Sequence, residues 1–172
     1  MADLGSDNGE LRKRVEECFS DDLCYIGYDA RTSYQSYDLS TFLEDDANIS
    51  LTRIRNDSID AIITIAVLDD RIEKKAMPED LWCSPYNNYN RTFLCYERSV
   101  YSKLSRKGYY APGRDYFWEF NFYLAQDEHL IYAARTNVMD LSKTTLVKEY
   151  CDLVISDMVW QNVIQIKRSA EK

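Results

Sequence analysis

The chain has 172 residues and a formal net charge of −8, with 45% hydrophobic and 29% charged residues. A chain of this length is typical of one domain that buries about two thirds of its unfolded surface, and this composition indicates a soluble globular protein. The negative charge argues against a nucleic-acid partner, because phosphate backbones bind basic faces. No run of the sequence approaches the ~20 apolar residues of a membrane-spanning helix.

The first third of the chain is predicted to hold a helix, a strand and a second helix. Asp7 and Glu10 form a capping pair before apolar residues at helical spacing, so we expect a helix from about Asn8 to Ser20 that ends at an acidic pair. Cys24 to Tyr28 is predicted to be a short strand. Apolar residues at helical spacing then favour a helix from about Asp45 to Arg55, although their alternation also fits a strand.

The most apolar stretch of the chain runs from Ile59 to Asp70. Its middle, Ile62 to Leu68, is rich in β-branched residues and lacks a polar face, which is typical of a strand buried on both faces. Because a strand and a helix are expected before it, we predict that it lies parallel to the Cys24–Tyr28 strand through a right-handed crossover.

The second half of the chain begins with a long tyrosine-rich insertion, residues 77–115, which shows no clean period. Strict alternation from Tyr116 to Leu124 then predicts an antiparallel strand, with Leu130 to Thr136 as its hairpin partner after a turn. A final helix is expected from about Lys143 to Gln161, deeply packed because most of its circumference is apolar.

Together these elements predict an α/β fold. We expect a mixed sheet with a buried central parallel strand, a C-terminal β-hairpin and about three covering helices. The predicted organisation is a single α/β domain over residues 1–166, followed by a polar C-terminal tail over residues 167–172.

No motif in the chain amounts to a catalytic signature. His129 falls in the predicted hairpin turn, and Cys18 and Cys151 lie on helix core faces, where free cysteine behaves as a small hydrophobe. No glycine-rich loop matches a phosphate-binding pattern. Three acidic pairs would suit a hard cation, but solvation and helix capping are the interpretation that we favour: Asp21-Asp22, Asp45-Asp46 and Asp69-Asp70. We therefore predict no enzyme activity, no cofactor and no metal site.

The tyrosine-rich insertion is the one suggestive feature. Tyrosine and tryptophan are favoured at protein interfaces, so this segment is a candidate partner-binding surface, or else a loop that folds over the sheet and completes the core. The candidate partner-binding residues are Trp82, Tyr86, Tyr89 and Tyr96. Cys83 and Cys95 flank a turn-prone stretch, and a hairpin there would let them form a disulfide in an oxidising compartment.

Two segments carry a resemblance to a known type of protein. One is the join Asn56-Asp57-Ser58-Ile59-Asp60-Ala61-Ile62-Ile63, and the other, after the tyrosine-rich insertion, is Trp118-Glu119-Phe120-Asn121-Phe122-Tyr123-Leu124. In this order of elements the chain resembles a family of uncharacterised bacterial envelope lipoproteins, similar in architecture to the amino-terminal domain of TolB and to curli-secretion-channel-like proteins.

The resemblance implies a non-enzymatic binding or structural domain on the periplasmic side of the cell envelope, with a protein or envelope component as its partner. It also implies a signal segment and a lipid-bearing cysteine upstream of Met1, which would be the chain's only link to a membrane. Two alternatives stay open: an acidic cytosolic inhibitor of the immunity type, whose carboxylates would mask a basic toxin, and an enzyme of unrecognised class that uses Asp69 or Asp70.

Overall fold

The structure is a computed structural model that describes residues 6–36, 52, 54–69, 91–104, 116–135 and 144–167. The chain divides into two compact units. The sheet unit comprises residues 40–139 together with residues 1–3, and the helical unit comprises residues 4–39 and 140–172. The helical unit is therefore built from both ends of the sequence.

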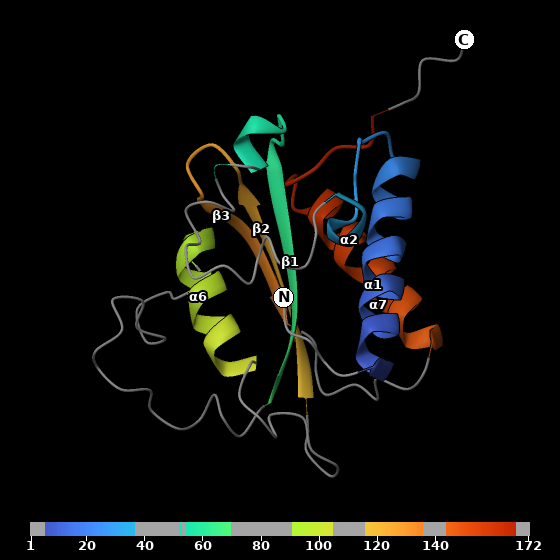
Figure 1. The fold of residues 1–172 in the computed structure, drawn as a ribbon. Coiled ribbons are helices and arrows are strands. Elements are labelled where there is room, and N and C mark those ends of the chain that lie inside the picture. The colour runs from blue at the N-terminus through green and yellow to red at the C-terminus, as the bar shows by residue number, and fades with distance from the viewer. Residues whose placement is uncertain are drawn as a thin grey trace. The chain divides into compact units, whose positions relative to one another are not determined.

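The sheet unit is built on three antiparallel strands in the order β1-β2-β3 (Figure 1). These are β1 (Ala61–Asp69), β2 (Tyr116–Leu124) and β3 (Leu130–Arg135). Pairing between β1 and β2 is regular along all nine residues of each strand. Pairing between β2 and β3 contains an irregularity between Phe122 and Tyr123. The predicted hairpin of β2 and β3 is thus confirmed.

The predicted parallel central strand is wrong. In the described sheet, β1 lies at an edge and pairs antiparallel with β2. The expected upstream strand, Cys24 to Tyr28, is instead the end of a helix and a turn. The consecutive residues Ala66, Val67 and Leu68 are all buried, whereas Ile62 to Ile65 are partly exposed, so only the last part of the run is buried on both faces. Burial on both faces does not determine the direction of the neighbouring strand.

Helix α6 (Phe93–Leu104) covers one face of the sheet (Figure 1). The rings of Phe93 and Tyr96 pack against that of Tyr123 on β2, with centroids 5.9 and 6.2 Å apart. Phe93, Tyr96 and Val100 are buried at helical spacing. No regular element was predicted here. The helical spacing of apolar residues covers only α6, and the rest of the insertion, which is rich in tyrosine and polar residues, shows no such spacing.

The turn between β2 and β3 caps the amino terminus of α6. The backbone N–H of Phe93 donates to the carbonyl of Glu128 over 3.2 Å, and that of Leu94 donates to the Glu128 carboxylate over 3.4 Å. The next amide, of Cys95, donates to the Thr92 hydroxyl. The guanidinium of Arg55 donates to the turn carbonyls of Ala125 and Gln126. The hairpin thus satisfies two first-turn amides that would otherwise lack partners, and Thr92 satisfies the third.

The helical unit is built on α1 (Ser6–Tyr25) and α7 (Thr144–Trp160), which pack against each other. The ring of Phe19 meets that of Tyr150 edge to face at 5.8 Å. The bounds of α7 confirm the prediction to within a residue at each end. Helix α1 runs past the acidic pair that was expected to end it, because Lys148 of α7 pairs with Asp22 at 2.5 Å.

Helix α1 ends instead in a Schellman motif. The amide of Tyr28 donates to the carbonyl of Leu23, and the amide of Gly27 donates to that of Cys24, both over 3.0 Å. Gly27 has a φ of +99°, which residues with a Cβ rarely adopt. The same pair of bonds ends α7, with Asn162 in the glycine position at a φ of +58°.

A chain segment after α1 folds back along that helix. Ser20 donates to the carbonyl of Ala30, and the carboxylate of Glu16 accepts the amide of Ser33 over 2.7 Å. This contact starts the short helix α2 (Ser33–Ser36), which lies in a segment predicted to be a loop. Of the helix predicted from Asp45 to Arg55, the described residues 52, 54 and 55 are helical, and the rest lies outside the described residues.

Candidate functional site

The predicted tyrosine surface falls mostly outside the described residues. Trp82, Tyr86 and Tyr89 all lie there, as does Cys83, so these parts of the site stay predictions. Tyr96 is 3% exposed and belongs to the core beneath α6. Cys95 is disulfide-bonded. Its pairing with Cys83 stays a prediction, because the partner cysteine is not among the described residues.

A row of polar side chains is buried between the sheet and α6. Glu119, Asn121 and Tyr123 alternate along β2 and share the face that α6 covers. All three are buried, Glu119 with 1% of its surface exposed. Thr64 lies opposite Asn121 on β1, and Arg135 lies opposite Glu119 on β3. The alternation of β2 is visible in the sequence, but not that a helix would cover its polar face.

The charges of this row are paired. The guanidinium of Arg135 contacts one carboxylate oxygen of Glu119 through both Nε and Nη2 at 2.5 Å. It also lies over the ring of Phe117, 5.2 Å from the centroid. Burial, and then the negative charge of Glu119, raise the pKa of the Tyr123 phenol above its ordinary value.

This arrangement is suited to fixing the register of the sheet. Among the described residues, no group of three or more His, Cys, Asp or Glu side chains could hold a metal ion. Shifting β2 by one residue would move the polar row to the opposite face and turn Trp118 and Phe120 toward α6.

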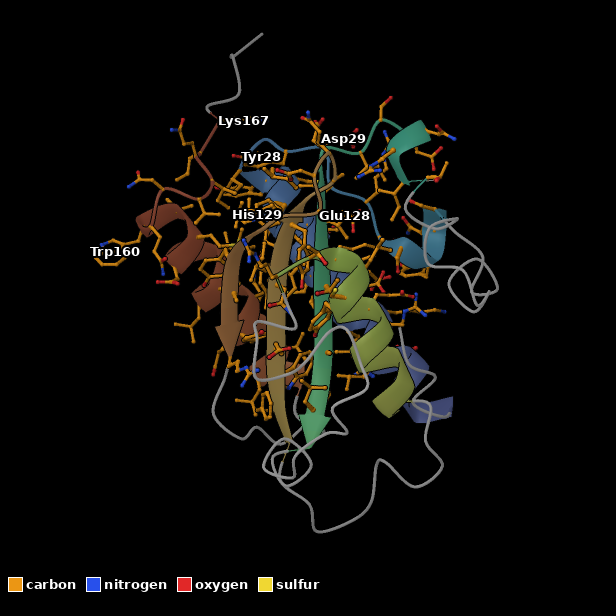
Figure 2. The ribbon with its side chains drawn as sticks, turned by 90° about the vertical axis from the view of Figure 1, so that its left-hand side faces the viewer. Tyr28, Asp29, Glu128, His129, Trp160 and Lys167 are labelled. Carbon is orange, nitrogen blue, oxygen red and sulfur yellow. The ribbon has the colours of Figure 1, made fainter. Side chains whose placement is uncertain are left out.

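The other predicted chemical residues are separated in the structure. His129 lies exposed in the β2–β3 turn, as predicted, beside Glu128 (Figure 2). Asp69 ends β1, and Asp70 lies outside the described residues. Asp22 pairs with Lys148 of α7, whereas solvation and helix capping were the roles expected for the acidic pairs. In the part of the chain that the structure describes, no helix is long and apolar enough to cross a membrane.

The helical unit exposes large apolar side chains. The buried stripe of α7 holds six residues at helical spacing: Val147, Tyr150, Cys151, Val154, Ile155 and Met158. Leu153 and Trp160 lie off this stripe and are 69% and 80% exposed, which departs from the deeply packed helix that was predicted. Figure 2 shows Trp160 projecting away from the end of α7.

Two more exposed apolar residues flank one backbone contact of the same unit. The amide of Lys167 donates to the carbonyl of Ile26 over 2.9 Å, and the Lys167 ammonium lies 4.0 Å from the ring centroid of Tyr28 (Figure 2). Tyr25 comes directly before Ile26 in the sequence, and Ile166 comes directly before Lys167. Their side chains are 90% and 62% exposed, respectively. We call Tyr25, Leu153, Trp160 and Ile166 the apolar set.

The sequence analysis missed the apolar set, although a signal for it exists. Trp160 follows Leu153 by seven residues, or about two helical turns, so both share a face that the buried stripe leaves outside. The buried stripe of α7 already supplies the apolar face that packs into the core. Leu153 and Trp160 are therefore apolar side chains that the core does not use.

Comparison of this chain with protein-family models, with curated proteins and with solved structures finds no match.

Proposed function

We propose that this chain is a non-enzymatic binding domain of a bacterial cell-envelope protein, located on the periplasmic side. The observation that carries the binding role is the apolar set of the helical unit. Each of its four side chains is well exposed, and tryptophan and tyrosine dominate the energetics of protein interfaces. Trp160 is 80% exposed, so a partner could remove most of its ring from water.

The nature of the partner follows from charge and from side-chain chemistry. The chain carries a net charge of −8, so anionic lipid headgroups and nucleic acids are unfavourable partners. An apolar set bordered by the carboxylate of Asp152 and the ammonium of Lys167 suits a protein surface with apolar pockets and a mixed polar rim. The proposed partner is accordingly a protein component of the envelope.

The proposed compartment is supported by the disulfide at Cys95. Structural disulfides persist in oxidising compartments such as the periplasm and are rare in the cytosol. Intact mass with and without reductant, after thiol alkylation of protein taken from its native cells, tests this step. A non-reduced sample in which all five cysteines are alkylated would contradict it and would favour the cytosolic inhibitor.

The binding role is tested by co-purification of a tagged double variant, Leu153→Ser with Trp160→Ser, from native cells. We expect the variant to lose a partner that the wild type retains, while its thermal unfolding stays close to that of the wild type because both side chains are exposed. The matched control replaces two exposed polar residues of the same helix, Glu149→Ser and Ser156→Ala, and should retain the partner. Equal recovery of every partner by both variants would contradict the proposal.

A further inference from the structure

Two thiols meet where α1 and α7 pack together. Cys18 and Cys151 are hydrogen-bonded to each other, with the Cys151 thiol donating to the Cys18 sulfur. Cys151 is fully buried, whereas Cys18 is half-buried. Cys24, one to two turns further along α1, is exposed and donates instead to the carbonyl of Ala30 over 3.5 Å.

Neighbouring contacts fix this pairing through the geometry of the two helices. The residue after Cys18 is Phe19, and the residue before Cys151 is Tyr150, and their rings meet edge to face. One turn further along α1, Asp22 pairs with Lys148, one turn earlier on α7. Both contacts lie within about one turn of the two thiols, so they place Cys18 beside Cys151 at the crossing of the two helices.

We propose that Cys18 and Cys151 are a dithiol site that closes to a disulfide by exchange with a disulfide oxidant, covalently joining the two ends of the chain. The structure holds the open, reduced form. The site is distinct from the Cys95 disulfide, which belongs to the sheet unit. It is also independent of the apolar set, since neither thiol belongs to it.

The exchange proceeds in two balanced steps. The Cys18 thiol loses its proton, and its thiolate attacks one sulfur of the oxidant's disulfide, which forms a mixed disulfide and releases one thiol. The Cys151 thiolate then attacks the Cys18 sulfur, which forms the Cys18–Cys151 bond and releases the second thiol. Two electrons pass from the pair to the oxidant, and the two protons end on the released thiols.

The surroundings assign Cys18 the first step. It is the accessible thiol of the pair, and the Cys151 S–H and the Lys148 ammonium both favour its thiolate. Burial nevertheless raises the pKa of both thiols, and the carboxylate of Asp22 adds to this effect. The dithiol therefore stays reduced until a disulfide oxidant reaches Cys18, and closure accelerates as the pH rises.

Closure would stabilise the helical unit in particular. This unit combines residues 4–39 with residues 140–172, so its two halves are connected only through the whole sheet unit. A Cys18–Cys151 bond closes a loop that spans most of the chain, and long loops gain the most from cross-linking in the chain-entropy model. We expect oxidation to raise the melting temperature by about 10 °C.

The test treats the purified full chain with oxidised glutathione at pH 8, followed by alkylation and peptide mass mapping. The wild type and Cys24→Ser should both yield a linked peptide pair containing Cys18 and Cys151, and both should melt at a higher temperature after oxidation. Cys18→Ser should yield neither result, with Cys151 recovered as a free thiol. Because a buried Cys151→Ser change could unfold the helical unit, the half-buried Cys18→Ser variant carries the comparison.

Two results would overturn the proposal. One is a wild type in which Cys18 is linked to Cys24 or only to glutathione while Cys151 remains free. The other is a Cys18–Cys151 bond that forms without any rise in melting temperature relative to the reduced protein, which would mean that the two helices do not pack as the structure has them.

Discussion

Replacement of Gly27 by alanine should destabilise the helical unit by an amount that the local geometry defines. A Cβ at this position would lie 2.8 Å from both the Cβ and the carbonyl oxygen of Lys167. The φ of +99° adds a conformational cost of about 1–2 kcal/mol for a residue with a side chain. The clash can be relieved only if Lys167 moves away. That movement breaks the hydrogen bond from the Lys167 amide to the carbonyl of Ile26, which is worth about 1 kcal/mol.

The expected loss is therefore about 2–4 kcal/mol, the upper end applying if the clash persists as overpacking. For a chain of this size, that corresponds to a fall in melting temperature of about 5–15 °C. Urea denaturation followed by circular dichroism measures the loss directly. A matched control is Gly9→Ala, because residue 9 lies inside α1, where alanine should stabilise the helix by up to about 1 kcal/mol.

Opposite signs for the same chemical change at two glycines would be hard to explain without the Schellman motif. If Gly27→Ala unfolded within about 0.5 kcal/mol of the wild type, neither the positive φ nor the contact with Lys167 could be present.

Three further changes test the buried polar row and the end of α7. Arg135→Met should cost about 2–3 kcal/mol in urea denaturation, because it leaves the Glu119 carboxylate buried without its guanidinium, and adding Glu119→Gln should recover part of that loss. Stability of the wild type should fall as the pH rises above about 10, because Tyr123 would ionise in the unfolded chain but not in the native structure. The stability of Tyr123→Phe should fall less steeply, and the two slopes should differ by up to about 1.4 kcal/mol per pH unit. Asn162→Gly should raise the melting temperature by a few degrees because glycine adopts its positive φ without strain, and an unchanged or lower value would contradict that conformation.

Local patterns predicted those elements whose signal is local. The alternation from Tyr116 to Leu124 gave the strand to the residue, because one face of it carries large apolar side chains without interruption. The apolar stripe of α7 similarly defined its bounds. The end of α1 was missed, although Gly27 offered a glycine in the position where helices adopt positive φ, because the acidic pair before it resembled a stop.

The direction in which strands pair and the helix that covers each face of the sheet depend on residues far apart in the sequence. Local sequence patterns predicted these features less well. The run from Ile62 to Leu68 reads the same whether its neighbour is parallel or antiparallel, so the direction of β1 depended on a first strand that proved helical. The burial of Glu119 depends on α6, which the sequence analysis did not find. The exposure of Trp160 is visible only once the buried stripe of α7 is known.

The most direct measurement of the binding role is site-specific photo-crosslinking in native cells. A photoreactive amino acid at position 160 should give a discrete crosslinked product with one partner protein, because the ring of Trp160 projects from the end of α7. The same amino acid at position 14, where Arg14 is an exposed residue of α1, should give none. Absence of a product at position 160, or the same products at both positions, would contradict a partner-binding surface at the apolar set.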